Sequence, residues 1–121
     1  MSVNILKNAL AELKMSANVE SSAIISNDGI LVTSDIDSKL HPESFAAMIS
    51  VTHNTALITM KSIGNRSIDR LIIENSDGSK MVTICAGSKA MVTTLLNPGN
   101  NIDSSLAEIK KTAATVKSYF G

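Results

Sequence analysis

Aromatic residues are scarce in this sequence of 121 residues: they make up 2% of it, and tryptophan does not occur. Surfaces that stack nucleic-acid bases and grooves that hold proline-rich peptides are built largely from such rings. Eleven basic residues balance eleven acidic ones, so the formal net charge is zero and no overall field attracts nucleic acid or an anionic membrane. The composition therefore argues against a nucleic-acid partner.

Cysteine and long apolar runs are scarce as well. The single cysteine, Cys85, lies in an apolar stretch and cannot form a disulfide within the chain, which favours a reducing environment. The N-terminal segment lacks the cationic and apolar regions of a secretory signal, and no apolar run approaches the roughly 20 residues that cross a bilayer. We therefore expect a cytoplasmic protein without a transmembrane segment.

The residues that are present alternate between helix and strand patterns. Hydrophobic residues make up 44% of the chain and charged residues 18%, as in globular proteins, and the length suits a single domain over residues 1–121. Apolar residues three and four positions apart indicate helices. Three are predicted: from about residue 3 to Asn18 with Ser2 or Asn4 as its cap, from Pro42 to Ser62 or Ile63 before Gly64, and from Ile102 to Phe120.

Five stretches rich in β-branched residues predict strands. Their expected bounds are Glu20–Ser26, Ile30–Ser34, Ser67–Glu74, Lys80–Ala86 and Ala90–Leu96. The links between neighbouring strands are short, which requires antiparallel pairing. The order αββαβββα therefore predicts an α+β sandwich, in which a five-stranded antiparallel sheet is covered by helices on both faces.

Two similar triplets connect pairs of these strands, Asn27-Asp28-Gly29 and Ser76-Asp77-Gly78. In a three-residue hairpin loop the last residue takes a positive φ, which suits glycine, and the side chains of the other two form local hydrogen bonds. We interpret Asp28 as a turn former and not as a metal ligand, because no histidine, cysteine or second carboxylate lies beside it.

Residues capable of catalysis or metal binding are scattered along the chain. Neither histidine, His41 or His53, lies at ligand spacing from a cysteine or the other histidine. We expect His53 to be partly buried and hydrogen-bonded, and Cys85 to be a core residue. Asp35 and Asp37 could bind a cation weakly, but solvated loop charge is the ordinary interpretation. No phosphate loop or serine-nucleophile motif occurs, so we predict no enzyme, cofactor or metal.

The predicted middle helix has an unusual distribution of polar residues. Its one charged residue between Ser44 and Asn65 is Lys61. A narrow polar strip of Ser50, Asn54 and Lys61 separates two apolar groups. The broader group should lie on the sheet and consists of Phe45, Ala46, Ile49, His53, Ala56, Leu57, Met60 and Ile63.

The second apolar group contains Ala47, Val51 and Ile58, flanked by Met48 and several threonines. A helix that is apolar almost all round is buried on more than one side. Because the chain is too short to supply a second layer, we infer that another copy covers this group and that the protein is a homodimer. The alternative is a weakly apolar surface helix that threonine and serine keep solvated. The strand Ser67–Glu74 is expected at the sheet edge, where it could pair with its own copy.

The whole pattern resembles the Roadblock/dynein light chain family. The resemblance rests on the element order, on the segment from Ala23 to Ile30 (AIISNDGI), on the long apolar helix after Pro42 and on Asn101-Ile102 at the last helix, and it covers nearly the whole chain. Asp103 departs from the family pattern, which has a small residue, often glycine, after the Asn-Ile pair. The implied fold is Roadblock-, longin- and profilin-like.

This resemblance also implies a function. Family members are non-enzymatic scaffolds or regulators of Ras-like small GTPases, and one bacterial relative promotes GTP hydrolysis by repositioning residues of its partner. The implied homodimer packs its middle helices together and pairs its third strands, with the GTPase lying over the helices. The candidate contact residues, for either the twin subunit or the GTPase, are Ala47, Met48, Val51, Thr55, Ile58, Thr59, Ser62, Leu71 and Ile73.

Two other functions stay open at this point. The chain could be a structural adaptor that joins proteins, for example a motor and its cargo, without any dependence on a nucleotide. It could also be a small-molecule sensor or an enzyme, which would need a deep pocket with convergent polar groups.

Overall fold

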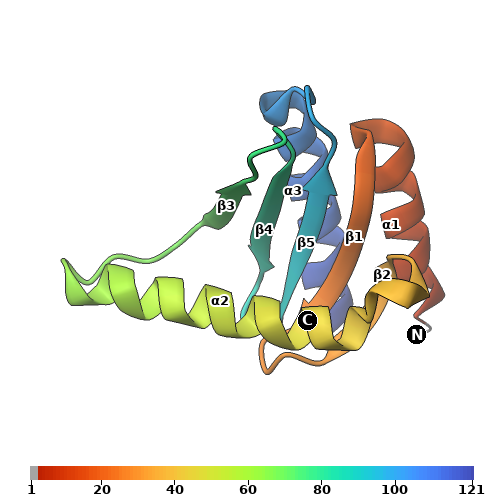
Figure 1. Ribbon diagram of the computed structural model, residues 1–121. Coiled ribbons are helices and arrows are strands. Elements are labelled where there is room, and N and C mark those ends of the chain that lie inside the picture. Colours follow the sequence, from red (N-terminus) through yellow and green to blue (C-terminus); the bar gives the residue numbers. More distant parts are fainter. Residues whose placement is uncertain (1–2) are drawn as a thin grey trace.

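The computed structural model describes residues 3–121, and the elements in this range follow the predicted order (Figure 1). A short 3₁₀ helix, η1, was not predicted and occupies Ser38–Leu40. The other elements are α1 (Asn4–Ala17), β1 (Val19–Ser26), β2 (Leu31–Asp35), α2 (Pro42–Ser62), β3 (Arg70–Glu74), β4 (Lys80–Ala86), β5 (Ala90–Leu96) and α3 (Ile102–Phe120).

The strands form one antiparallel sheet in the order β2-β1-β5-β4-β3, so β3 lies at an edge as expected. The predicted bounds of β3 were wrong at its start, because residues 67–69 are irregular and the strand begins at Arg70. The reason is geometric. Helix α2 ends past the edge of the sheet, and residues 63–69 lead the chain back to the sheet (Figure 1).

Helices cover both faces of the sheet, which confirms the predicted sandwich. Helices α1 and α3 lie side by side on one face, and the larger core beneath them includes Leu10, Ile24 and Ile109, all 1% exposed or less (Figure 1). Helix α2 crosses the other face near one end of the strands, over a smaller cluster that includes Ile25 and Ile49. The two core layers explain why β1 and β5 are apolar on both sides.

The start of α1 differs from the sequence expectation in detail, whereas α3 begins at Ile102 as predicted. Ser2, one of the two expected caps of α1, lies outside the described residues, and Val3 occupies the N-cap position before Asn4. Helix α3 is capped by Asn101, whose side-chain oxygen accepts hydrogen bonds from the backbone N–H groups of Asp103 at 3.0 Å and Ser104 at 3.3 Å. The carboxylate of Asp103 therefore lies in the first turn, where negative charge suits the helix dipole.

Hydrogen bonds fix the first half of α2 to the hairpin of β1 and β2. The sequence placed Ser50 in a narrow polar strip of α2, and the structure shows that this residue is buried, with 5% of its surface exposed. Its hydroxyl donates to the carbonyl oxygen of Asn27 at 3.1 Å. Gly29 has φ +88°, and a Cβ added there would lie 3.2 Å from the Cβ of Ser50. The turn glycine thus allows the close approach of helix and hairpin.

Both predicted turns are confirmed, with Gly29 and Gly78 at positive φ. The Ser26 hydroxyl hydrogen-bonds the carboxylate of Asp28 within the first turn, so Asp28 is a turn former. In the second turn, Asp77 accepts from the hydroxyl of Ser79 at 2.6 Å and from its backbone N–H at 2.9 Å. These hydrogen bonds, the hydroxyl first, hold the pKa of Asp77 below its ordinary value of 3.8.

The Asp77 turn sets the register of β3 on β4, and its stability should depend on pH. Because the pKa of Asp77 is lower in the folded chain, its stabilising effect is complete above the unfolded pKa of 3.8 and is lost as pH falls through the folded pKa. We expect Asp77→Asn to lower the urea midpoint of unfolding at pH 7, and the deficit to shrink as pH falls below the unfolded pKa of Asp77.

The control for this prediction is Ser79→Ala, which removes the hydroxyl donor but keeps the carboxylate. In that background the pH-dependent part of the Asp77→Asn effect should become smaller. A deficit of the same size at pH 7 and at low pH would contradict the assignment of Asp77 as a stabilising carboxylate.

Candidate functional site

Helix α2 is longer than the sheet face that supports it. Its buried residues are Pro42, Ala46, Ile49, Ser50 and His53, and none lies beyond His53. Residues 54–62 add about 13 Å of helix at 1.5 Å per residue, and Figure 1 shows this half extending past the edge strand β3. The sequence placed Ile63 on the sheet-facing side, which was wrong: it is 66% exposed, because no strand lies beneath it.

The outer face of α2 exposes large apolar side chains. Met48, Val51 and Ile58 are 62%, 65% and 68% exposed. All the predicted contact residues on this helix are exposed, as the helical wheel indicates: Ala47, Met48, Val51, Thr55, Ile58, Thr59 and Ser62. We call these seven residues the outer face of α2. Burying its three large side chains would remove a substantial apolar area from water.

Three hydroxyl groups on or beside the outer face, those of Thr52, Thr59 and Ser62, are already hydrogen-bonded within the helix. Thr52 donates to the carbonyl oxygen of Met48 and Thr59 to that of Thr55, both at 2.8 Å, and Ser62 donates to that of Thr59 at 2.7 Å. Another surface could therefore cover these groups without leaving an unsatisfied donor. Thr59 and Ser62 of the outer face would therefore add little to the cost of burying it.

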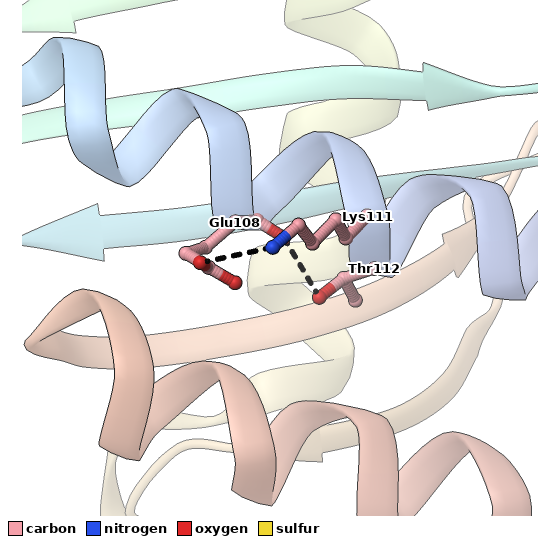
Figure 2. Close-up of polar contacts among 3 residues, drawn as sticks. All are labelled: Glu108, Lys111 and Thr112. Carbon is pink, nitrogen blue, oxygen red and sulfur yellow. Dashed lines mark hydrogen bonds and ion pairs between the residues drawn. The ribbon is translucent and has the colours of Figure 1, made fainter.

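Helix α3 shows the contrasting pattern of a helix that faces water. Figure 2 shows Lys111 and Glu108 paired, with Nζ 3.3 Å from Oε1, and the Thr112 hydroxyl donating to the Glu108 carbonyl oxygen at 3.3 Å. Lys110 and Lys117 are also exposed on this helix. The outer face of α2 has no such charges, so its composition is not a general property of the helices of this chain.

A groove of about 620 Å³ lies between the second half of α2 and β3. It brings together four of the predicted contact residues, Val51, Thr55, Thr59 and Leu71. The other five do not line it: Ala47, Met48, Ile58, Ser62 and Ile73. Sequence reasoning missed further lining residues, including Thr52, Met60 and Ile68, because the groove forms only where the overhanging helix and the return segment converge.

Strand β3 continues this surface along the sheet edge. Leu71 and Ile73 are half-buried and lie opposite Thr83 and Met81 of β4, on the sheet face that α2 occupies. Ile72 is 41% exposed on the other face. An edge strand has unpaired backbone groups that can accept another strand. The outer face of α2, the groove and the β3 edge therefore form one continuous candidate interaction surface.

A second cavity, of about 130 Å³, lies on the same sheet face near η1. Its lining includes Leu40, Phe45 and Met81, and no ionisable side chain lines it. Small-molecule sites usually measure about 300–1,000 Å³ and contain a few convergent polar groups. This cavity is smaller than such a site, and the polar residues in its lining are Ser21, Ser22, Thr93 and Thr94.

The structure brings His53 and Cys85 together, which the sequence did not reveal. The Nε2 atom of buried His53 lies 3.3 Å from the Sγ atom of Cys85, as expected for a hydrogen-bonded histidine. Cys85 is half-buried and not a full core residue as predicted. Burial, and then the negative charge of Asp69, raise the pKa of the Cys85 thiol. A raised pKa keeps the thiol protonated at neutral pH, so the pair is a weak nucleophile.

The two loop carboxylates have structural partners instead of a shared ligand. Asp35 forms an ion pair with Lys14 at 3.7 Å. The carboxylate of Asp37 accepts from the backbone N–H of Lys39 at 3.0 Å and thereby caps η1. Within residues 3–121, no group of three potential metal ligands is assembled. In the same range, no helix combines the length and the apolarity needed to span a bilayer.

Comparison with known proteins first gives distant sequence relatives. No family model matches the chain. Two uncharacterized proteins of Methanocaldococcus jannaschii, MJ1340 and MJ0714, are 24% identical over 115 residues and 25% identical over 117 residues. The first alignment covers 95% of this chain and 99% of the relative, and the second covers 97% and 98%.

Solved structures identify the fold. MglB of Myxococcus xanthus aligns with a TM-score of 0.85 and 16% identity, over 98% of this chain and 90% of MglB. A Roadblock/LC7 domain of Streptomyces avermitilis aligns with a TM-score of 0.82 and 17% identity, over 91% and 92%. Profilin IA of Acanthamoeba castellanii aligns with a TM-score of 0.63 and 12% identity, over 99% of this chain and 100% of profilin IA. These similarities confirm the predicted architecture: the chain folds as a Roadblock/LC7 domain.

Proposed function

We propose that the chain is a homodimeric scaffold or regulator that binds a Ras-like small GTPase and is not itself an enzyme. The observation that carries this proposal is the exposed outer face of α2 beside the open β3 edge. The Roadblock/LC7 fold supports the choice of partner, because the family that the sequence resembles serves small GTPases. A cytoplasmic location would suit such a partner.

The hydrophobic effect favours a second copy on this surface. Burying the exposed two-thirds of Met48, Val51 and Ile58 would stabilise the dimer by about 1–2 kcal/mol for each side chain, and both subunits contribute. Association costs an estimated 4–15 kcal/mol or more in translational and rotational freedom. The free energy gained by burying the two helix faces is therefore of the same order as the cost of association. Pairing of the β3 edges would supply the remaining stabilisation.

Two-fold symmetry makes the same surface available on both copies, as in most homodimers. The groove between α2 and β3 is open to solvent in a single chain, and its volume of about 620 Å³ would accept apolar side chains of a facing helix. In such a dimer the two α2 helices would lie next to each other. Their remaining exposed residues would form a platform with few charges.

The α2 helices of this platform would offer a GTPase no catalytic group. The one histidine on α2 is buried against Cys85, and Lys61 is the only charged residue on α2 after Glu43. Any stimulation of hydrolysis would have to act by repositioning residues of the GTPase itself. The chain would therefore regulate or anchor its partner through contact, without supplying chemistry.

The dimer can be tested with a double substitution, Val51→Glu with Ile58→Glu. The change would bury four unpaired carboxylates in the dimer, so we expect the dissociation constant to rise at least about 100-fold. Light scattering coupled to gel filtration measures the mass, and circular dichroism checks that each chain is still folded. A folded double variant that keeps the dimer mass would contradict the proposed interface.

The matched control for that experiment is Met15→Glu. Met15 is 89% exposed on α1, on the opposite side of the sheet, so it presents a large apolar side chain outside the proposed interface. We expect Met15→Glu to leave the dimer mass unchanged. Loss of the dimer in this variant would indicate that any added charge dissociates the protein.

The GTPase partner can be tested by capture. The immobilised wild-type protein is incubated with small GTPases from the same cell, loaded with either GTP or GDP. We expect retention of one GTPase to differ between the two nucleotide states by at least about tenfold, or about 1.4 kcal/mol. Equal retention of both forms would favour the adaptor alternative, and retention of neither would contradict the proposed partner.

A further inference from the structure

The edge strand β3 has a charge pattern that is complementary to itself. Its sequence is Arg70-Leu71-Ile72-Ile73-Glu74, with a positive residue at one end, a negative residue at the other and three apolar residues between them. Arg70 and Glu74 are both exposed. When such a strand is turned end for end, its positive end meets the negative end of the original.

The hairpin next to β3 determines which backbone groups point outward. The Asn75 N–H donates to the Ser79 carbonyl oxygen at 2.8 Å. In an antiparallel ladder, hydrogen-bonded and non-hydrogen-bonded pairs alternate. The Asn75–Ser79 pair is hydrogen-bonded, so the pairs two and four residues before Asn75 are hydrogen-bonded as well. The backbone N–H and C=O groups of Ile73 and Leu71 therefore point toward β4. The remaining residues of β3, namely Arg70, Ile72 and Glu74, direct theirs away from the sheet.

These outward groups limit how two β3 strands can pair as an antiparallel ladder. The register centred on Ile72 places all five residues opposite a residue of the partner strand, and it sets Arg70 opposite Glu74 of the partner subunit. A shift by two residues sets one of the charged residues opposite Ile72. A shift by four sets two arginines or two glutamates opposite each other, which is destabilising.

The side-chain faces agree with the same register. Arg70, Ile72 and Glu74 lie opposite Ile84, Val82 and Lys80 of β4, and Ile84 and Val82 belong to the core on the α1 and α3 side. Each Glu74 would therefore have Lys80 on one side and Arg70 of the partner subunit on the other. On the α2 side, Leu71 would lie opposite Ile73 of the partner subunit and extend the apolar floor of the groove.

We propose that Arg70 and Glu74 are the self-recognition residues of the β3 edge: they set the register of an intersubunit strand pair and select a second copy of this chain over strands with a different charge pattern. This inference rests on the homodimer proposed above. It adds the specificity of the contact, since the outer face of α2 is almost uncharged and cannot discriminate by charge between its own copy and a similar apolar helix.

The test uses two charge reversals, Arg70→Glu and Glu74→Arg. Each converts two opposite-charge pairs of the dimer into like-charge pairs, so each variant alone should dimerise with a dissociation constant raised about tenfold or more, measured by sedimentation equilibrium. Random pairing in an equimolar mixture would make half of all dimers heterodimers. We expect a fraction well above half, because the acidic edge of one variant then faces the basic edge of the other. Native mass spectrometry counts the three dimers.

Comparing the heterodimer with the two homodimers in one mixture cancels the effect of each substitution on the folding of its own chain. Glu74→Arg places an arginine beside Lys80, but this cost is present in both the homodimer and the heterodimer and cancels between them. Lys110→Glu, on the exposed side of α3, is the control and should give a statistical mixture with the wild type.

The outcomes separate this inference from the proposed dimer. A wild-type chain that stays monomeric would overturn the dimer and the strand register together. A wild-type dimer whose charge variants keep the same dissociation constant, or mix statistically, would overturn the register and leave the dimer intact.

Discussion

The exposed apolar outer face of α2 is the feature on which the rest of the account depends. The helix is anchored only as far as His53 and then continues past the sheet, so Ile58 has no support from its own chain. Contact between water and these apolar side chains is unfavourable, and the hydroxyls of Thr52 and Thr59 bond to the helix itself. The constraint therefore arises from helix length as much as from composition.

Two local arrangements make this geometry possible. The contact of Ser50 with Asn27, beside Gly29, fixes the first half of α2 close to the hairpin of β1 and β2. The turn containing Asp77 joins β3 to β4 and leaves β3 as an edge. Residues 63–69 connect the overhanging helix to that edge, so the outer face of α2 and the β3 strand become neighbouring parts of one surface.

The sequence predicted the local features well because turns, strand pairing and helix periodicity depend on nearby residues. Contacts between distant residues account for what the pattern did not predict: Ser50 is polar but buried through its bond to Asn27, and Ile63 is apolar but exposed where the sheet ends. The pairing of His53 with Cys85 and the groove beside β3 depend on where α2 crosses the strands. The spacing of residues within a single helix or strand does not determine where α2 lies across the sheet.

In the proposed function the chain acts through contact with other proteins, and self-association is the first step. The most direct test is sedimentation equilibrium of the wild-type protein from about 1 to 100 µM. The account predicts twice the mass of one chain over the upper part of this range, with dissociation on dilution. A folded monomer at every concentration would mean that water covers the outer face of α2 after all, and the central claim would be wrong.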